Sequence, residues 1–586
     1  MAKPFEVIVV GGGLAGLAAS MKLSELGVKV KVFSIVPVKR SHSVCAQGGI
    51  NAAVNTKGEG DSVEEHFDDT IYGGDFLANQ EPVKEMTAAA PDVVFLYDRM
   101  GVPFSRTPEG LLDFRRFGGT KHHRTAFAGA TTGQQLLYAL DEQVRRHEVT
   151  GTVEKFEFWE FLSVVKDNAG VAKGIIAVNV ITMEVKSFRA DAVMLCTGGN
   201  GLIFGKSTNS VVNTGTAQSS AYQQGATYAN GEFIQVHPTA IPGLDKLRLM
   251  SESARGEGGR VWTYKNGKPW YFLEEKYPAY GNLVPRDIAT REIFDVCVRQ
   301  KLGVNGENQV FLDLSHLSKE FLDRRLGGIL EIYETFVGED PHKVPMKIFP
   351  GMHYTMGGLW VDYNLMTSIP GMFAGGECNY EYHGANRLGA NALLSCTFDG
   401  LKGGKKILEY CKSLSKQSAD LEESIFTAEE NRMREKLEAI NAMDGKENVF
   451  ALHEMLGVSM TENVTVVRNN TDLQKTLDLI NDLEQRSANI GLCSDSAVYN
   501  QELLFINHFS NMLQLAKVIT KGALLRNESR GAHYKPDYPD RNDADWLKTT
   551  MAKYTPNGPE ISYAQVDTRF IKPRPRVYNV DKKVAA

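Results

Sequence analysis

Three glycines near the start of the chain have the spacing of a phosphate-binding loop. Gly11, Gly13 and Gly16 follow the apolar run Phe5–Val10 and precede the helical stretch Leu17–Leu26. In this strand–loop–helix context the first glycine permits a tight turn, the second lets the backbone approach a pyrophosphate, and the third lets the helix pack closely on the strand. The N–H groups at the start of the helix attract phosphate oxygens. The pattern therefore predicts a dinucleotide site.

The kind of dinucleotide depends on residues further along the chain. The second expected strand, Val28–Phe33, ends at Ser34, where NAD and FAD sites of this type usually carry Asp or Glu for the ribose. The loop alone therefore leaves NAD and FAD open. Two later expected strands, Asp191–Cys196 and Gly371–Ala374, also run into glycines. Glycine-ended strands so far apart favour one long cofactor cradled along its whole length, which indicates FAD.

The composition is that of an ordinary globular protein with several domains. The chain has 586 residues, of which 42% are hydrophobic and 23% are charged, and its net charge is -6. About three or four domains are expected, and fibrous, disordered and nucleic-acid-binding classes are excluded. No stretch has the roughly 20 apolar residues of a transmembrane helix. The N-terminus lacks the features of a signal peptide, so we expect a chain that stays in the cytoplasm.

The seven cysteines are scattered, and none forms a Cys-x-x-Cys pair. Scattered cysteines fit a reducing compartment. Their spacing argues against an iron–sulfur cluster or a zinc framework held by this chain itself. No metal ligands are assigned.

The amino-acid composition of the chain changes after about residue 405. Residues 406–525 contain few glycines and carry apolar residues at helical spacing, for example in Ala428–Ile440 and Leu473–Ser487, so a helical domain is expected. Residues 526–586 hold more Pro, Tyr and Asp and end in a basic tail. This tail is expected to be extended, with solvated side chains, along the surface. Its basic residues are Arg569, Lys572, Arg574, Arg576, Lys582 and Lys583.

The segment Arg40–Ile50, with His42 inside Arg-Ser-His-Ser and Ala-Gln-Gly-Gly after it, resembles the flavin-attachment stretch of the flavoprotein subunits of succinate dehydrogenase and fumarate reductase. The likeness runs in family order along essentially the whole chain. The stretch Val38–Phe76 is most similar to the Gram-positive succinate:menaquinone type. Further matching segments are Phe117–Gly119, Arg124–Ala126, Val236–Thr239, Ser251–Gly259, Arg286–Asp287, His353–Gly358, Gly375–Glu377, Gly384–Gly389 and Glu528–His533.

The resemblance implies an α/β fold with a Rossmann-like FAD-binding domain and an inserted α+β capping domain. A helical domain and a small C-terminal domain would follow. The implied bounds are 1–235 and 351–405 for the two parts of the FAD-binding domain, 236–350 for the capping domain, 406–525 for the helical domain and 526–586 for the C-terminal domain. Ligand sites favour such domain junctions.

The resemblance also implies that FAD is covalently attached, through its 8α-methyl carbon, to His42. Covalent substitution raises the potential of the flavin, as oxidation of a poor hydride donor such as succinate requires. The other residues implied to contact the cofactor are Gly11, Gly13, Leu14, Ala15, Gly16, Ser34, Arg40, Ser41, Gln47, Gly48, Gly49, Gly198, Thr216, Glu377, Ala392 and Leu393. Thr216 and Ala392 depart from the residues of some relatives, which weakens their individual assignments, although contacts through the backbone remain compatible with FAD.

A four-carbon dicarboxylate requires two anion sites, and arginine suits carboxylates because it binds them at two points. By resemblance, His353 and Arg387 hold one carboxylate. The other is surrounded by His237, Ser251 and Glu252. Ser251 replaces the threonine of some relatives and keeps the hydroxyl. Phe117 is expected to wall the pocket.

The resemblance assigns the proton step to Arg286, while the hydride passes between substrate and flavin N5. Glu252 and Arg255 are three residues apart and share a face on a helical turn. They are implied to relay the proton between Arg286 and solvent.

The resemblance further implies partners: an iron–sulfur subunit that takes the electrons, and membrane cytochrome b or anchor subunits through which quinone is reached indirectly. The expected location is peripheral, on the cytoplasmic face of the cell membrane. The basic tail and the helical domain are candidate partner surfaces. The alternatives are an L-aspartate oxidase, a soluble fumarate reductase and a non-catalytic flavin scaffold. His42 argues against the L-aspartate oxidase, which holds FAD without a covalent bond. The absence of a Cys-x-x-Cys-His haem motif argues against the soluble fumarate reductase. A scaffold would have no use for the full set of polar pocket residues His237, Glu252, Arg255, Arg286, His353 and Arg387.

Overall fold

The computed structural model describes residues 4–243 and 246–578. Its centre is a five-stranded sheet in which every pairing is parallel, in the order β19-β10-β1-β2-β6. Strand β1 (Glu6–Val10) is buried between β2 (Lys29–Ser34) and β10 (Ala192–Leu195). The outer strands are β6 (Val153–Glu157) and β19 (Met372–Ala374). Continuous apolar runs such as Val7–Val10 suit a parallel sheet that is covered on both faces.

Glycines let two helices pack closely beside this sheet. Helix α1 (Leu14–Glu25) contacts α10 (Asn391–Lys412) and α4 (Thr132–Val149). A Cβ atom at Gly400 would lie 2.4 Å from the carbonyl oxygen of Ala15, so no larger residue fits there. Gly400 and Gly404 are four residues apart, and both face α1, which places a glycine seam along the contact.

Smaller sheets and helices surround this core. Antiparallel strands β7, β8 and β9 form one sheet, β3, β5 and β4 form another, and β20 and β21 join β11 and β18 in a third. Their bounds are β7 (Trp159–Lys166), β8 (Ala172–Asn179), β9 (Val185–Arg189), β3 (Ile50–Asn51), β5 (Thr125–Ala126), β4 (Phe114–Arg115), β11 (Tyr228–Ala229), β18 (Gly358–Leu359), β20 (Lys548–Lys553) and β21 (Glu560–Gln565), with helices α2 (Val63–Gly73), α3 (Gln80–Arg99) and α5 (Thr216–Gln223) beside them.

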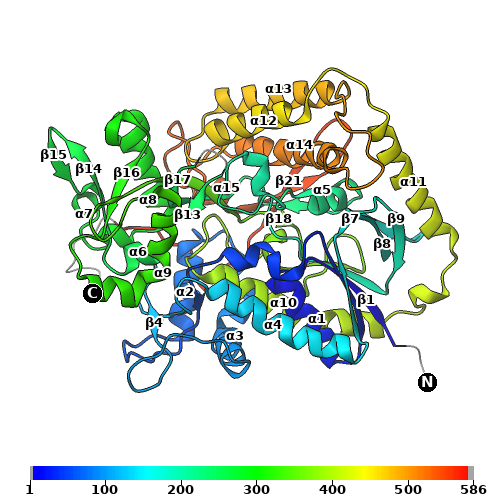
Figure 1. The fold of residues 1–586 in the computed structure, drawn as a ribbon, viewed down its shortest axis with the longest axis horizontal. Helices are drawn as coiled ribbons and strands as arrows, with labels where there is room; N and C mark the ends of the chain where they lie inside the picture. The colour runs from blue at the N-terminus through cyan, green and yellow to red at the C-terminus, as the bar shows by residue number, and fades with distance from the viewer. Residues whose placement is uncertain (1–3, 244–245, 579–586) are drawn as a thin grey trace.

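Residues 241–348, here called the inserted unit, have a hydrophobic core of their own. The unit projects to the left in Figure 1, where it is green. Two neighbouring strands, β12 (Ile234–Ile241) and β17 (Met346–Thr355), carry the chain into it and out of it. Its antiparallel sheet has the order β13-β12-β17-β16-β14-β15. The other elements are β13 (Arg248–Leu249), β14 (Arg260–Lys265), β15 (Lys268–Trp270), β16 (Val310–Asp313), α6 (Ser253–Gly256), α7 (Phe272–Lys276), α8 (Arg286–Phe294) and α9 (Lys319–Val337).

The helical stretch expected after residue 405 is present. Ala428–Ile440 lies within α11 (Ser424–Asn441), and Leu473–Ser487 lies within α13 (Asn470–Ser487). Helices α12 (Val449–Val464), α13 and α14 (Gln501–Leu525) pack together along the top of Figure 1. Among the residues that the structure describes, no helix is long and apolar enough to span a membrane.

The C-terminal tail is extended, but the expectation of solvated side chains is wrong for one of its arginines. The side chain of Arg576 is only 8% exposed and forms an ion pair with Asp287 in α8. A buried, paired arginine is not available to a partner protein. Lys582 and Lys583 lie outside the described residues.

The close packing around the first glycine loop predicts a strong effect of one methyl group. In Gly16→Ala the added Cβ would lie 1.8 Å from the carbonyl oxygen of Gly11, a backbone atom that cannot swing away. We expect the free energy of unfolding to fall by about 1–3 kcal/mol or more, measured as a lower thermal midpoint. Gly327→Ala in α9 is the matched control, because nothing lies within 4 Å of its added Cβ. Equal thermal midpoints for the two variants would contradict this reading.

Candidate active site

Two pockets meet in the body of the protein. The first is long and lies at the carboxyl ends of β1 and β10, with about 1040 Å³ of space when the part open to solvent is counted. The second lies between the body and the inserted unit. Four residues line both pockets: His42, Ser43, Glu377 and Cys396. A ligand that fills the first pocket would therefore present one end to the second.

The glycine loop forms one wall of the long pocket. Gly11 has a φ of +117°, and a Cβ there would lie 2.1 Å from the carbonyl oxygen of Cys196. Gly13 is the residue before α1, and the N–H group of Leu14 at the start of that helix donates to Ser43 Oγ at 3.2 Å. The pocket thus places a bare backbone and a helix N-terminus together, as a pyrophosphate requires.

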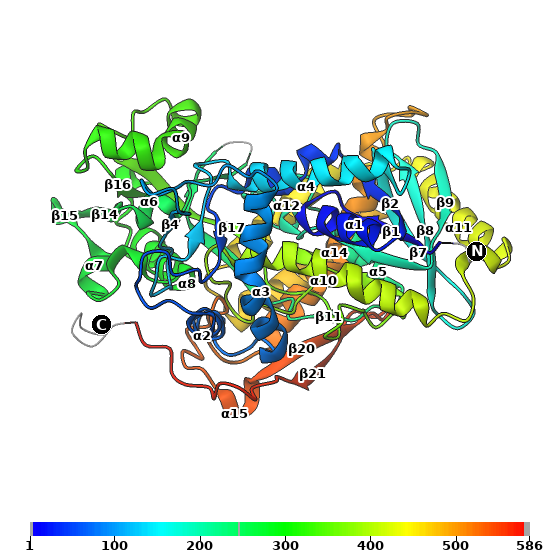
Figure 2. The same ribbon diagram turned by 90° about the horizontal axis from the view of Figure 1, so that it is seen from below.

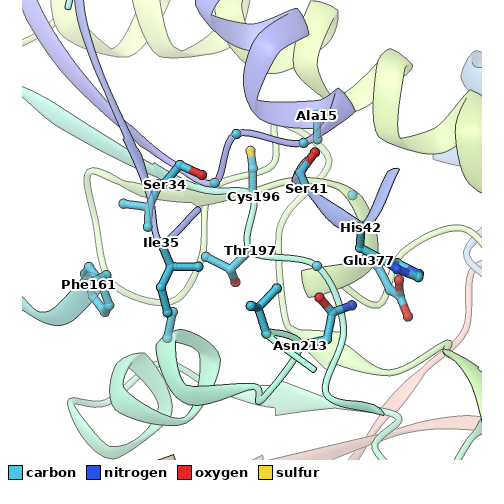
Figure 3. Close-up of a pocket in the computed structure, with 18 of the residues that line it drawn as sticks. Ala15, Ser34, Ile35, Ser41, His42, Phe161, Cys196, Thr197, Asn213 and Glu377 are labelled. Atoms are coloured by element: carbon cyan, nitrogen blue, oxygen red, sulfur yellow. The ribbon is translucent and has the colours of Figure 1, made fainter. Parts of the chain in front are cut away.

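Polar atoms without partners line the rest of this pocket. Among the described residues, Ser41 Oγ, Thr197 Oγ1 and Asn213 Nδ2 are buried and make no hydrogen bond. Figure 3 shows Ile35 and Phe161 toward one end of the pocket, and His42 and Glu377 at the other. Buried polar groups normally have partners, so these atoms indicate a long ligand with polar groups along its length. FAD fits these residues.

His42 is held as a neutral ring. Its Nδ1 accepts a hydrogen bond from the backbone N–H of Ser210 at 3.1 Å, and the side-chain amide of Asn209 lies 3.3 Å from Nε2. Burial, together with the positive charge of Lys246, lowers the pKa of His42 to about 4. A backbone N–H can only donate, so Nδ1 carries the lone pair. Nε2 is left as the nitrogen that could bond to another group.

The second pocket is built around a buried carboxylate between two arginines. Arg286 Nε donates to Glu252 Oε2 at 2.7 Å, and Arg255 Nη2 donates to Glu252 Oε1 at 3.0 Å. The backbone N–H of Gly118 also donates to Oε1, at 3.1 Å. Burial opposes ionisation of Glu252, but the charges of Arg286 and Arg255 outweigh it, so its pKa lies below the ordinary value. Glu252 is therefore an anion at neutral pH.

Arg387 supplies a further positive charge to this pocket. Its guanidinium lies over the ring of Tyr354, 4.4 Å from the centroid, and its buried Nε has no partner among the described residues. Burial first, and then repulsion from Arg286, lower the pKa of Arg387 to about 10, so the group stays protonated at neutral pH. With one carboxylate among three arginines, the cluster has a positive excess that suits an anionic ligand.

Two histidines stand next to one another across β12 and β17. The ring centroids of His237 and His353 are 5.0 Å apart. His237 Nδ1 accepts from the backbone N–H of Thr239 at 3.2 Å, and Thr208 Oγ1 lies 2.7 Å from His353 Nδ1. Burial and the charge of Arg286 hold both histidine pKa values well below the usual range. Both rings are therefore neutral, and His237 presents Nε2 as an N–H donor.

Gln235 is a functional residue that the sequence reasoning missed. Its Oε1 accepts from Arg286 Nη1 at 2.9 Å, while its Nε2 donates to the backbone carbonyl of Arg387 at 2.7 Å. The glutamine therefore fixes the distance between the two arginines. A signal was present: Gln235 and His237 are two residues apart in one strand, and such residues share a face. Thr208, Asn209 and Ser210, which contact His42 or His353, carried no such pattern.

Most of the predicted site residues line one of the two pockets. The first is lined by Gly11, Gly13, Leu14, Ala15, Ser34, Ser41, His42, Gly198, Thr216 and Glu377. The second is lined by Gln47, Gly48, Gly49, Phe117, His237, Ser251, Glu252, Arg286, His353, Arg387, Ala392 and Leu393. Gly16 and Arg255 lie behind the pocket walls. Arg40 is exposed and lines neither pocket, so the structure does not bring it to the site. The hydroxyl of Ser251 donates to Ser253 Oγ at 3.0 Å.

Removal of the Glu252 charge should destabilise the protein in a pH-dependent way. Glu252→Gln leaves Arg286 and Arg255 without their shared anion, and we expect a loss of about 3–5 kcal/mol in the free energy of unfolding. Because the folded pKa lies below the ordinary value of 4.5, this contribution is present above about pH 4.5 and is lost as the pH falls through the folded pKa. Thermal midpoints measured against pH should therefore converge for wild type and variant on acidification.

The matched control for this prediction is Glu274→Gln. Glu274 binds Arg260 through a similar two-point ion pair, but both side chains are about one-third exposed. Its loss should cost no more than about 1 kcal/mol. If Glu252→Gln lowered the midpoint no more than the control, the carboxylate would not be holding the arginines together.

Two family profiles match the chain. The profile described as an FAD binding domain covers residues 6–393. The profile described as the C-terminal part of fumarate reductase flavoprotein covers residues 453–578. The first includes every residue that lines the two pockets except Cys396, and the second includes α13, α14 and the extended tail.

Several known proteins are similar to this chain over its whole length. The succinate dehydrogenase flavoprotein subunit of Bacillus subtilis is 66% identical over 582 residues, covering 99% of each chain. The fumarate reductase flavoprotein subunit of Escherichia coli is 32% identical, covering 99% of this chain and 97% of the relative. Among solved structures, a chain of Escherichia coli quinol fumarate reductase has a TM-score of 0.92, with 32% identity and 99% of each chain covered. Mycobacterium smegmatis Sdh1, solved in complex with UQ1, has a TM-score of 0.83, with 30% identity and coverage of 96% and 94%.

Proposed function

The chain belongs to the family of flavoprotein subunits of succinate dehydrogenase and fumarate reductase, and we propose that its active site interconverts succinate and fumarate. It is an α/β oxidoreductase subunit that binds FAD. One observation carries the proposal of the reaction: Arg286 and Glu252, backed by Arg255, lie in one pocket with Arg387 and two neutral histidines, and that pocket opens onto His42.

The substrate would lie between the FAD-binding body and the inserted unit, which we assign as the capping domain, 236–350. Arg387 and His353 hold one carboxylate, and His237 and Ser251 hold the other. Neutral histidines donate hydrogen bonds without adding charge, so the positive charge that binds the dianion comes from arginines, which suit carboxylates. Phe117 walls the pocket, where it packs against Gly48. When bound, FAD supplies the hydride acceptor and donor through its N5 atom.

Arg286 acts as the proton donor and acceptor toward the substrate carbon. A free arginine is a poor base, because its pKa is above about 12. In this site Glu252 bonds to Arg286 on one side and to Arg255 on the other. A proton can therefore pass between the two guanidinium groups through the carboxylate. Arg255 also donates to the backbone carbonyl of Asn282 at 2.7 Å, which points the relay away from the pocket.

His42 is the point of covalent attachment for FAD in this proposal. The N–H group of Ser210 occupies Nδ1, so Nε2 is the atom that would hold the 8α-methyl carbon of FAD. The lowered pKa keeps the ring neutral and nucleophilic at neutral pH. The attached ring also fixes one end of the cofactor at the junction of the two pockets.

The proposed assembly follows from the family. The electrons pass to an iron–sulfur subunit and from there, through membrane anchor subunits, to quinone. The subunit is placed at the cytoplasmic face of the membrane, where it is peripheral. Sdh1 of Mycobacterium smegmatis, solved in complex with UQ1, and a quinol fumarate reductase solved with menaquinol molecules support the link to quinones.

Replacement of Arg286 tests the proton step. Arg286→Gln cannot donate a proton, so we expect turnover of succinate with an artificial electron acceptor to fall by about 10²–10⁴-fold. Bound flavin, measured by absorbance, should stay at the wild-type level. Arg291→Gln is the control on the same helix, because Arg291 points to Asp287 and does not line the pocket. Wild-type turnover by Arg286→Gln would refute the assignment.

Replacement of His42 tests the attachment. Acid-precipitated wild-type protein should keep its flavin in the pellet, because a covalent bond survives unfolding. His42→Ala should release all its flavin into the supernatant, where fluorescence measures it. His123→Ala is the control, since that ring is partly exposed and pairs with Glu59 at 2.7 Å. Release of flavin from the wild-type protein would show that the bond does not form.

A further inference from the structure

The C-terminal stretch of the described residues joins the body to the inserted unit. After β21 ends, residues 566–578 run without helix or strand, and Figure 2 shows this red segment passing α2 toward the green inserted unit. Gln80, at the start of α3, fixes the segment: its Oε1 accepts from the N–H groups of Phe570 and Ile571 at 2.8 Å each. The N–H group of Val577 donates to the hydroxyl of Tyr72 in α2 at 2.7 Å. The tail is therefore held firmly on the body.

Arg576 reaches from this tail across the junction. Its Nη1 and Nη2 bind the two carboxylate oxygens of Asp287 at 2.9 and 3.2 Å, which is a two-point contact. The same Nη1 lies 3.5 Å from Asp75, a residue that follows α2 in the body. The side chains of Arg576, Asp75 and Asp287 are 8%, 7% and 1% exposed. One buried arginine thus joins a carboxylate of the body to a carboxylate of the inserted unit.

The carboxylate on the inserted unit is next to the proposed acid–base group. Asp287 directly follows Arg286 in the first turn of α8. A contact that fixes Asp287 therefore also fixes the start of the helix from which Arg286 reaches Glu252. Tyr578 extends the same contact, because its ring lies 5.6 Å from that of Tyr72 in the body and 5.1 Å from that of Tyr280 in the inserted unit.

We propose that Arg576 is a positioning residue that clasps the inserted unit in its closed position over the dicarboxylate pocket. The proposal rests on the proposed function, since it concerns the pocket assigned there to succinate and fumarate. The inserted unit has its own core and two connecting strands, and units of this kind move relative to their neighbours unless the interface holds them. Removal of Arg576 leaves Asp75 and Asp287 facing each other with less positive charge between them.

Without Arg576, each of the two carboxylates keeps an arginine on its own side of the junction. Asp287 keeps Arg291 at 3.4 Å, and Asp75 keeps Arg541 at 2.8 Å. A second pair across the junction, Arg325 with Asp113 at 2.7 Å, has side chains 19% and 11% exposed. Loss of Arg576 should therefore make the closed position less populated without abolishing it. For a ligand that binds only the closed position, the apparent Kd equals the intrinsic Kd divided by the fraction of molecules that are closed.

The test compares two arginines of the same tail in the assembled complex. Arg576→Gln removes the clasp. Arg574→Gln is the matched control, because Arg574 forms its ion pair with Asp68 of α2 and stays on the body. Binding of malonate, a dicarboxylate that lacks the CH₂–CH₂ bond to be oxidised, is followed through the flavin absorbance. Steady-state oxidation of succinate gives kcat and KM.

For Arg576→Gln we expect the malonate Kd and the succinate KM to rise together by roughly tenfold, with kcat within about twofold of wild type because saturating substrate restores closure. Arg574→Gln should match wild type, and Arg576→Lys should recover part of the affinity. Asp287→Asn combined with Arg576→Gln should weaken binding no more than either change alone.

An unchanged malonate Kd in Arg576→Gln would overturn the clasp, as would an equal loss in Arg574→Gln. A fall in kcat with an unchanged Kd would also overturn it, since that pattern belongs to misfolding or to the proton step. If the wild-type complex neither oxidised succinate nor bound malonate, the proposed function would fail instead, so the two failures are distinguishable.

Discussion

The structure depends on one buried electrostatic arrangement, the carboxylate of Glu252 between the guanidinium groups of Arg286 and Arg255. A carboxylate buried alone would favour its neutral form, because an unpaired buried charge is expensive, and the two guanidinium groups keep Glu252 ionised. Together they form a cluster whose positive excess is shared with Arg387. This cluster requires walls that exclude water, and the junction between the body and the inserted unit supplies them. The carboxylate and two of the arginines lie on the inserted unit, while Arg387 lies on the body, so the cluster is complete only when both parts meet.

The same arrangement accounts for the histidines. Surrounded by arginines and buried, His237 and His353 would gain little from a proton, and their pKa values fall accordingly. Neutral rings with one nitrogen already occupied are directional donors or acceptors, and Thr239 and Thr208 select which nitrogen remains. The pocket therefore separates two tasks: arginines provide charge, and histidines provide direction.

Local pattern predicted the local structure well. The strand, loop, helix and strand from Phe5 to Phe33 appear as β1, α1 and β2, because apolar β-branched runs and the glycine spacing are properties of short segments. Most of the site residues named from the resemblance line the two adjoining pockets; Gly16 and Arg255 lie behind the walls, and Arg40 is exposed elsewhere. What the sequence could not supply depends on contacts between distant segments. The strand spacing of Gln235 and His237 indicated a shared face, but it could not indicate that Gln235 would meet Arg286 of α8. The burial of Arg576 arises from Asp287 and Asp75, carboxylates that lie hundreds of residues earlier, and no local composition reveals it.

The order of strands in the central sheet limits when the sheet can form during synthesis of the protein. The sheet contains β1 from the first residues and β19 from residues 372–374, and β10 must pair with both. The groove for FAD lies against these strands, so it cannot be completed until β19 has left the ribosome. At about 5–20 residues per second, translation reaches β19 roughly 20–75 s after β1 is made. During that interval the N-terminal glycine loop lacks the rest of the groove. Helix α10, which packs on α1, is made later still. The full set of residues that line the FAD groove therefore exists only when synthesis of the chain is well past its midpoint.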